Sequence, residues 1–595
     1  MERMRLLALK HNEFKVLHAL TTTGDRLTQR DLASLCDLSL GSVNAAFGSC
    51  EQAGYIEDGR ISPAGVEALD PYKVDNAVIM AAGLSSRFAP ISYEKPKGVL
   101  KVRGQVLIER QIQQLLQAGI EDITVVVGYK KEYFFYLAQK YNVKIVVNSN
   151  YASRNNNESL WLVRDKLKNT YICSSDDYFC ENPFQRYVYK AYYACVYAEG
   201  ETDEWCITTG ANNRIVDVVV GGRDSWIMLG HVYFDHEFSD KFKKILEAEY
   251  PKLETADKLW EQIYIDHIKE LDMVCRQYDD GIIYEFDSLD ELRGFDPMFM
   301  RNVDTDIFKN ICATLDCEVD DICGFYPLKQ GLTNLSCHFR VGDKEYVYRH
   351  PGVGTEKLID RKSEKEALVL AGQLGLDDTF LYMNEDEGWK ISRFIEDAKT
   401  LDPDNDVQLK QAMEMCRRLH QSDATLGRSF DFVEEGLRYE KLICQIAPIE
   451  IPGYDELKEK ILRLKAYTDA DDFSSCISHN DFFKLNFLID REEKINLIDW
   501  EYAGMSDEAN DFGTFVVCCQ LDETRANKAL AYYFGHTPTP EQKRHYWAYA
   551  VFAGWCWYVW SLEKEAEGEN VDQWLYIYYT YAANYIDDVL ASYEK

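Results

Sequence analysis

The stretch from residue 477 to residue 502 constrains this chain more than any other, because its polar residues are spaced for one kind of chemistry. It reads ISHNDFFKLNFLIDREEKINLIDWEY, with Asn486 five positions after Asp481 and Asp499 at the end of a short apolar run. Phosphoryl transfer from a nucleotide needs a carboxylate facing the acceptor hydroxyl, and an amide plus a second carboxylate to hold magnesium on the phosphates. If His-x-Asp were the only motif, a loop and hairpin with scattered acidic residues would be the simpler interpretation. Three such elements in order favour phosphoryl transfer.

Length and charge set the wider limits. At 595 residues the chain is too long for one core, so we expect two to four domains. Its 66 basic and 100 acidic side chains give a formal charge of −34, which disfavours general binding to nucleic acid or anionic lipid. No apolar run approaches the roughly 20 residues of a membrane span, and no signal peptide is visible at Met1, so we expect a cytoplasmic protein without membrane insertion. The 17 cysteines are scattered without a C-x-x-C pair, which is typical of small packing residues.

Residues 1–72 resemble a winged helix-turn-helix domain (α+β). Three short helical patterns precede a tight hairpin at GYIEDGRI, residues 54–61. The expected recognition helix, residues 41–52, has no Lys or Arg, and residues 1–70 hold seven basic and ten acidic side chains. Because phosphate contacts dominate affinity for DNA, this charge disfavours DNA binding without excluding it. Docking, dimerisation into a homo-oligomer, or effector sensing is the preferred hypothesis.

A glycine turn follows a buried strand pattern at residues 76–82. The loop Ala82-Gly83-Leu84-Ser85 exposes backbone N–H groups that can cradle a triphosphate. Arg87 and Lys97 can neutralise the charge that builds as pyrophosphate leaves.

A second strand pattern, residues 171–175, ends at Asp176 and Asp177. Carboxylates at the carboxyl end of a parallel strand lie at the binding crevice of an open sheet, so we expect them to bind magnesium, Asp176 ahead of Asp177. An acidic turn is the alternative.

Residues 73–300 resemble the nucleotidyltransferases with the signature A-A-G-x-G-x-R…P-K, although Ser85 replaces the usual second glycine. From N-N-N-E-S at residue 155 through E-W-C, K-L-W-E and Y-E-F-D-S, the chain resembles the phosphocholine cytidylyltransferases of bacterial phosphorylcholine pathways. The resemblance implies an α/β Rossmann-like (GT-A-like) fold with a mostly parallel sheet, acting on CTP and phosphocholine with Mg²⁺. It implies Asp287 as a further metal ligand, contacts to the nucleotide from Asn155, Asn157 and Ser159, and contacts to phosphocholine from Trp205, Tyr233 and Trp260.

Residues 301–595 begin with a strand–turn–strand pattern in which Gly331, Thr333 and Asn334 could fold over nucleotide phosphates. A strand then ends at Arg349, where protein kinases carry a phosphate-binding lysine, and Glu364 or Glu366 could pair with it. The strand at residues 390–395 is typical of a hinge that grips adenine by its backbone, which assigns Phe394 and Ile395 to the nucleotide.

This half resembles the choline kinase and aminoglycoside phosphotransferase superfamily, through R-H-P-G-x-G-T, I-D-R-x-x-E and H-N-D-x-x-x-x-N…D-W-E. The resemblance implies a bilobal α+β protein-kinase-like fold that uses ATP and Mg²⁺, with Asp481 as the base and Asn486 and Asp499 as metal ligands. It also places Glu501, Tyr502, Trp557 and Trp560 beside the substrate. A quaternary ammonium cannot donate a classical hydrogen bond, so aromatic faces must hold it. The aromatic stripe could instead be core.

The two halves together predict CDP-choline synthesis, in which the kinase makes phosphocholine from choline and ATP and the transferase joins it to CTP. Two alternatives stay open. The kinase could act on another small alcohol or amine beside a sugar-1-phosphate nucleotidyltransferase, or the chain could be a choline-responsive regulator.

Overall fold

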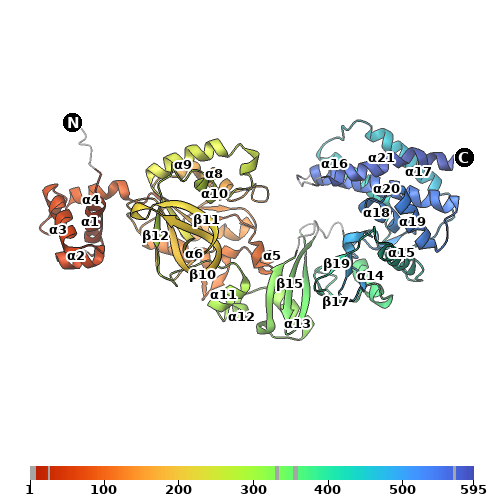
Figure 1. Cartoon of the computed structure of the whole chain (residues 1–595), viewed down its shortest axis with the longest axis horizontal. Helices are drawn as coiled ribbons and strands as arrows, with labels where there is room; N and C mark the ends of the chain where they lie inside the picture. The colour runs from red at the N-terminus through yellow and green to blue at the C-terminus, as the bar shows by residue number, and fades with distance from the viewer. Residues whose placement is uncertain are drawn as a thin grey trace. The chain divides into compact units, whose positions relative to one another are not determined.

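Residues 8–23, 27–328, 334–352, 359–566, 568, 571 and 573–594 are described by a computed structural model (Figure 1). The chain divides into two units, residues 1–310 and residues 311–595. In the part of the chain that the structure describes, no helix is long and apolar enough to cross a membrane. The finer boundaries expected at residues 72 and 300 stay predictions.

Unit 1 opens with the expected winged helix-turn-helix fold. Its elements are α1 (His11–Thr23), α2 (Gln29–Cys36), α3 (Leu40–Gln52), β1 (Ile56–Glu57), β2 (Arg60–Ile61) and α4 (Pro63–Leu69). Local capping fixes the helix starts: Thr28 and Asp31 form a reciprocal capping box on α2, and the Ser39 hydroxyl accepts from the N–H of Ser42 on α3.

A seven-stranded sheet in the order β12-β10-β11-β8-β3-β6-β7 follows. Its strands are β3 (Asn76–Ala81), β6 (Ile123–Val127), β7 (Lys144–Val147), β8 (Thr170–Ser174), β10 (Tyr192–Thr209), β11 (Ile215–Phe234) and β12 (Val274–Gln277). Strands β8, β3, β6 and β7 are parallel, which confirms the expected α/β class. Their side chains alternate between two cores: Ile79 and Val125 pack on one face, Val78 and Val126 on the other. The carboxyl ends of β3 and β8 therefore lie next to each other.

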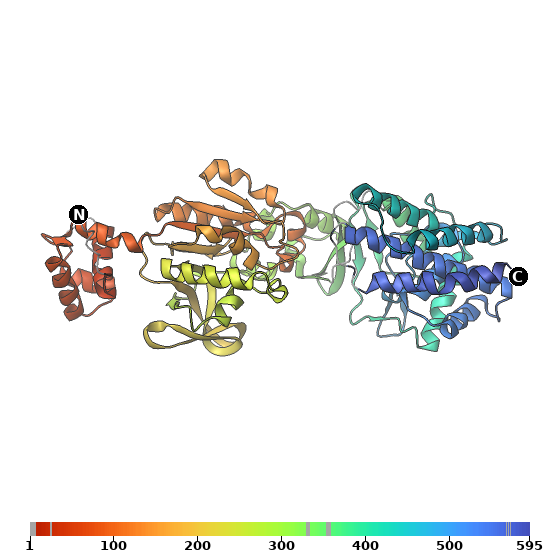
Figure 2. The same cartoon turned by 90° about the horizontal axis from the view of Figure 1, so that it is seen from above.

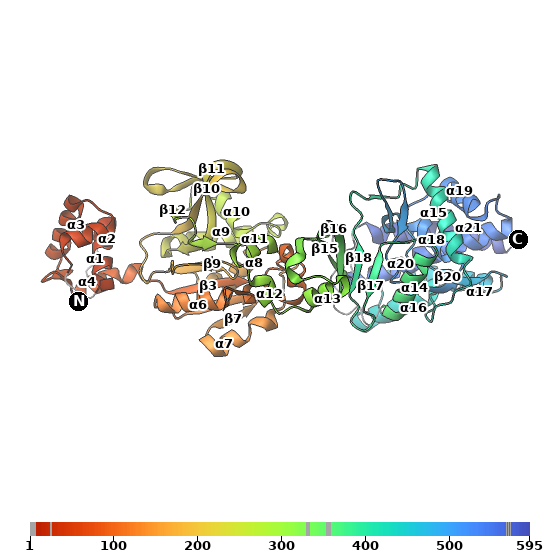
Figure 3. The ribbon, with the colours of Figure 1, turned by 90° about the horizontal axis from the view of Figure 1, so that it is seen from below.

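The antiparallel hairpin of β10 and β11 was not predicted. The two strands run 18 and 20 residues and extend from the sheet (Figure 3). Their pairing is interrupted by register shifts.

Unit 2 contains a five-stranded antiparallel sheet in the order β14-β15-β16-β18-β17 and a mainly helical lobe (Figure 2). The strands are β14 (Ile322–Pro327), β15 (Asn334–Val341), β16 (Lys344–Pro351), β17 (Phe380–Met383) and β18 (Lys390–Arg393), with α14 (Arg361–Gln373) after β16. The helical lobe holds α15 (Asp406–His420), α16 (Phe432–Ile446), α17 (Tyr454–Thr468), α18 (Asn510–Cys518), α19 (Glu523–Phe534), α20 (Pro540–Ala566) and α21 (Trp574–Tyr593). This arrangement confirms the kinase-like fold.

An antiparallel strand pair, and a hairpin that lies between its two strands in the sequence, carry residues 477–502. Strand β20 (Ser475–Ser478) pairs with β23 (Gly504–Asp507), and β21 (Phe487–Ile489) pairs with β22 (Ile495–Leu497). The pairing brings Asp481, Asn486 and Asp499 onto the loops between these strands.

Candidate functional site

A cavity of about 720 Å³ opens at the carboxyl ends of β3 and β8 in unit 1. Its lining comprises residues 80–87, 96–98, 134, 148, 151–156, 159, 174–176, 257 and 259. The predicted loop Ala82-Gly83-Leu84-Ser85, Arg87, Lys97 and Asp176 all line it. The geometry agrees with a crevice outside the carboxyl ends of parallel strands.

The backbone conformation at Ser85 is one that favours glycine. Ser85 has a φ of 52°, in the left-handed region that favours glycine, whereas a Cβ on Gly83 would meet nothing within 4 Å. Serine therefore occupies the position where glycine would be favoured for its backbone conformation.

The cations of this site lie against its acids. Lys97 is buried, pairs with the Asp176 carboxylate at 2.9 Å, and donates to the carbonyl oxygen of Phe286. Arg87 pairs with Asp287 at 2.7 Å. Four side chains that are up to 200 positions apart are thus brought to one place, and Lys97 links the segment of Asp176 to the segment that carries Asp287.

The acids form an electronegative cluster. Burial and the charge of Asp176 together raise the pKa of Glu285 to about 7, while the charge of Lys97 opposes the shift. Asp177 is fully buried, neither of its carboxylate oxygens has a hydrogen-bond partner among the described residues, and burial raises its pKa well above the usual value. Carboxylate oxygens are the donors that Mg²⁺ prefers, so Asp176, which lines the cavity, fits the metal, whereas Asp177 is not among the lining residues. Glu285 was missed, although it lies two positions before Asp287.

The residues predicted to contact the nucleotide divide into two groups. Asn155 and Ser159 line the cavity, as does Asn156, which the sequence analysis did not single out. Asn157 is fully buried and donates to the carbonyl oxygens of Thr255 (2.9 Å) and Lys258 (2.5 Å). Its amide therefore holds the loop beside the cavity, and Asn157 is not among the residues that line the cavity.

The aromatic residues predicted to contact phosphocholine in unit 1 also fall into two groups. Tyr233 and Trp260 are 0% and 1% exposed and belong to the two hydrophobic cores, so we assign them to packing and correct their expected contact with substrate. Trp205 is half-buried on β10. The neighbouring Glu204 is near Asp287 and Arg87: burial raises its pKa, and the charge of Asp287 adds to the shift. The sequence around a tryptophan does not show whether its ring packs in a core or contacts a ligand, and Trp260 was therefore assigned wrongly.

Unit 2 has its own cavity, of about 570 Å³. Asn334, Arg349, Phe394, Ile395 and Asp499 line it, as expected. Gly331 and Thr333 lie outside the described residues.

The cation expected on β16 is paired with a carboxylate on α14. Both terminal nitrogens of Arg349 donate to Glu364, whereas Glu366 is exposed. Arg361 also donates to Glu364, at 2.8 Å. The adjacent cations lower the pKa of Glu364 far below its usual value against the effect of burial. Glu364, and not Glu366, is therefore the partner of Arg349.

The loop that carries Asp481 and Asn486 brings these two side chains into contact. The amide nitrogen of Asn486 donates to the backbone oxygen and to Oδ2 of Asp481, both at 2.8 Å, which leaves its amide oxygen to face a metal. Burial raises the pKa of Asp481 to about 8, with Asp499 as the next contributor. Asp499 lines the cavity and has a φ of 67°. Oxygen donors from Asn486 and Asp499 fit Mg²⁺.

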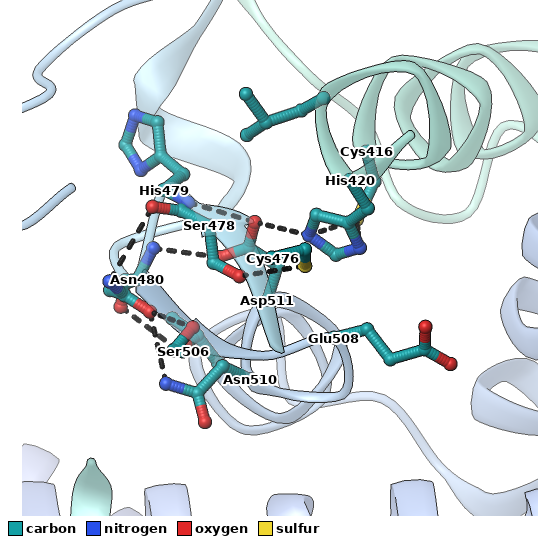
Figure 4. Close-up of polar contacts among 12 residues, drawn as sticks. Cys416, His420, Cys476, Ser478, His479, Asn480, Ser506, Glu508, Asn510 and Asp511 are labelled. Carbon is teal, nitrogen blue, oxygen red and sulfur yellow. Dashed lines mark hydrogen bonds and ion pairs between the residues drawn. The ribbon is translucent and has the colours of Figure 1, made fainter. Parts of the chain in front are cut away.

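A buried aspartate holds this loop in place (Figure 4). Asp511 on α18 accepts from the backbone N–H of His479 at 2.9 Å and of Asn480 at 2.7 Å, and its Oδ2 lies 3.0 Å from Nε2 of His420. Ligand atoms of Cys416, His420 and Asp511 lie within 4.8 Å of one another, but the carboxylate is already committed to these contacts. We therefore assign this cluster to loop positioning. Asp511 was not among the predicted residues, because the groups that it positions in the loop are backbone N–H groups.

Three of the predicted substrate residues, Tyr502, Trp557 and Trp560, have neighbouring rings. The ring of Tyr502 lies 6.1 Å from that of Trp557, which lies 6.1 Å from that of Trp560. Trp557 is 7% exposed, Trp560 is half-buried, and the indole N–H of Trp557 has no hydrogen-bond partner among the described residues. Glu501 instead accepts from the Asn334 amide at 2.7 Å and lies 3.8 Å from Arg361, so these two residues hold its carboxylate.

Comparisons with known proteins match separate parts of the chain to different families. Residues 326–547 match the model of the phosphotransferase enzyme family, residues 77–180 that of the MobA-like NTP transferase domain, and residues 9–57 that of a winged helix-turn-helix DNA-binding family. The chain is 36% identical over 217 residues to the choline-phosphate cytidylyltransferase of Streptococcus pneumoniae, covering 36% of this chain and 95% of that protein.

Two further relatives are similar to different parts. A 2-aminoethylphosphonate cytidylyltransferase of Lancefieldella rimae is 34% identical over 225 residues, covering 37% of this chain and 92% of that protein. The crystal structure of the choline kinase LicA from Streptococcus pneumoniae is 26% identical with a TM-score of 0.42, covering 48% of this chain and 98% of that chain.

Proposed function

The chain belongs to the choline-phosphate cytidylyltransferase family, and from that membership we propose that it makes CDP-choline in two successive reactions. Unit 2 phosphorylates choline with ATP, and unit 1 transfers a cytidylyl group from CTP to the phosphocholine formed. One observation carries the proposal: a single chain holds the Lys97–Asp176 site and the Asp481–Asn486–Asp499 site, and the product of one reaction is the substrate of the other.

In unit 1, a phosphate oxygen of phosphocholine attacks the α-phosphorus of CTP, the new P–O bond forms, and the bond to pyrophosphate breaks. The backbone N–H groups of residues 82–85 hold the triphosphate, and Arg87 and Lys97 neutralise the charge that develops on the leaving pyrophosphate. Asp176 and Asp287 would hold Mg²⁺, which supplies further charge neutralisation at the phosphates.

In unit 2, the choline hydroxyl oxygen attacks the γ-phosphorus of ATP and ADP leaves. A primary alcohol has too high a pKa to lose its proton beforehand, so Asp481 orients it and accepts the proton late. The hydrogen bond from Asn486 to Oδ2 of Asp481 orients the carboxylate for this role. Asn486 and Asp499 would hold Mg²⁺, which neutralises charge on the transferred phosphoryl group.

Aromatic residues supply selectivity for the trimethylammonium group. In unit 2 the faces of Tyr502, Trp557 and Trp560 form the site, and each aromatic contact with a cation contributes roughly 0.5–2 kcal/mol. In unit 1, Trp205 and the carboxylate of Glu204 are the corresponding candidates.

Incubation of the protein with choline, ATP, CTP and Mg²⁺ tests the proposal, with products separated by mass spectrometry. We expect phosphocholine, CDP-choline, ADP and pyrophosphate. Ethanolamine offered to the kinase and 2-aminoethylphosphonate offered to the transferase serve as competitors that lack the quaternary nitrogen. Preference for either competitor, or no CDP-choline, would contradict the proposal.

For the N-terminal domain we propose a docking or sensing role in a protein of the cytoplasm, where ATP and CTP are available. In support, the expected recognition helix α3 carries no cation. Salt-dependent binding of the full chain to double-stranded DNA would contradict this role.

A further inference from the structure

Two cations lie opposite each other on neighbouring strands of the sheet in unit 2. Arg349 on β16 and Lys390 on β18 are register partners in the antiparallel ladder. Both are buried, with 5% and 9% exposure. Like charges directly opposite one another destabilise a sheet, and burial increases the cost. An anion must therefore compensate them.

The carboxylate between them is shared with a third cation. Glu364 accepts two hydrogen bonds from Arg349 and one from Arg361, and it lies 3.5 Å from the ammonium of Lys390. Arg361 in turn lies 3.8 Å from Glu501. Glu364 is thus occupied by the two arginines, and its contact with Lys390 is the longest of the set.

Lys390 has donors to spare. Within the described residues, Glu364 at 3.5 Å is the only hydrogen-bond or ion-pair partner of its ammonium, which can donate three hydrogen bonds. The side chain lines the 570 Å³ cavity together with Arg349 and Asp499. The guanidinium of Arg349, by contrast, has both terminal nitrogens committed.

We propose that Lys390 is a second phosphate-binding cation of the kinase site and contacts the β- or γ-phosphate oxygens of ATP. This inference rests on the proposed kinase function. Arg349 and Glu364 fix the position of α14 relative to the sheet, and Lys390 supplies the compact ammonium that can follow the phosphates. The polyphosphate supplies negative charge beside the Arg349–Lys390 pair in addition to that of Glu364.

Nucleotide binding to the full-length Lys390→Met variant tests the assignment, because phosphate contacts can be separated from adenine contacts. We expect affinity for ADP and ATP, measured by isothermal titration calorimetry, to fall roughly ten- to a hundred-fold. Affinity for adenosine, which has no phosphate, should stay within a factor of two of the wild type. Lys390→Arg should recover part of the loss for ADP, since it restores the charge.

Lys344→Met is the matched control, because Lys344 lies in the same sheet but is exposed at the start of β16. It should bind ADP like the wild type. Lys390→Gln provides the same comparison if methionine is not accommodated. Equal losses for adenosine and ADP would assign Lys390 to structure and overturn the inference, as would unchanged ADP binding. If the wild-type protein binds neither ATP nor ADP, the kinase function itself fails.

Discussion

Asp481 is the residue on which the kinase reaction depends most directly. We expect Asp481→Asn to lower the rate of phosphocholine formation by roughly 10²–10⁴-fold, because the amide has the same shape but cannot accept the hydroxyl proton. ADP release with choline as acceptor measures this loss. Cytidylyl transfer to supplied phosphocholine should be unchanged in the same preparation. Asp472→Asn, at an exposed position, is the control; equal losses in both variants would contradict the role of Asp481.

His545 makes the stability of unit 2 depend on pH. Its two ring nitrogens lie 2.9 Å from Asp471 and 3.1 Å from Asp507, and Arg544 and Tyr593 also contact Asp471. Burial lowers the pKa of His545, but the two carboxylates outweigh burial and raise it above its usual value of 6.5. A raised pKa in the folded state means that the stabilisation is complete below about pH 6.5 and is lost as pH rises through the folded-state pKa.

The corresponding variant is His545→Gln. We expect it to lower the free energy of unfolding of unit 2 by roughly 1–3 kcal/mol at pH 6, because charged hydrogen bonds are lost, and by less at pH 9. Urea unfolding of both proteins across this range measures the difference. A difference that grew with pH would show that the imidazole is neutral when folded.

Residue identity could be predicted where the chemistry is local in sequence. Asp481, Asn486 and Asp499 lie within 19 positions, Lys97 follows the glycine turn, and Asp176 follows a strand pattern. Asp511 could not be found this way, because it acts on backbone N–H groups. Tyr233 and Trp260 show the converse: their side chains suit a cation site, but only tertiary packing decides whether an aromatic ring reaches a cavity.

At the scale of elements, helix α18 links packing to catalysis. Gly513 lies two residues after Asp511, and a Cβ there would approach the backbone oxygen of Tyr549 on α20 to 2.4 Å. The two helices can be this close only because residue 513 has no side chain.

We therefore expect Gly513→Ala to destabilise unit 2 by about 1–3 kcal/mol through overpacking. Displacement of α18 would also move Asp511, so the kinase rate should fall while cytidylyl transfer persists. Thermal unfolding and the two activity assays measure both effects. Gly427→Ala, where a Cβ meets nothing within 4 Å, should leave stability and activity near wild type. A Gly513→Ala protein with unchanged stability would mean that the helices separate at no cost.

Elements with a clear run of apolar residues, or with turn residues at their ends, were predictable. The parallel strands β3, β6, β7 and β8 are examples. The hairpin of β10 and β11 was not predictable, because its register shifts break the alternation of buried and exposed residues that identifies a strand. Lys390 likewise comes to lie beside Arg349 only through strand pairing, which a linear pattern does not reveal.

At the scale of the whole molecule, the two sites are built from separate parts of the chain. Every residue lining the 720 Å³ cavity lies within residues 80–259, and every residue lining the 570 Å³ cavity lies within residues 328–499. The acids that complete the first site, Glu285 and Asp287, also belong to unit 1. Neither set of lining residues contains one from the other unit, so each reaction should proceed when the other site is inactivated.

Mixing two single-site variants tests this independence. Lys97→Gln should lose cytidylyl transfer, since it removes the cation paired with Asp176, yet keep the kinase reaction. Asp481→Asn should do the reverse. Neither variant alone should convert choline to CDP-choline, whereas an equimolar mixture should do so after a lag, because phosphocholine must first accumulate in solution. Added phosphocholine should abolish the lag. If each variant is active in its own half-reaction but the mixture stays inactive, phosphocholine does not pass through solution, and the two sites must act on it within one molecule.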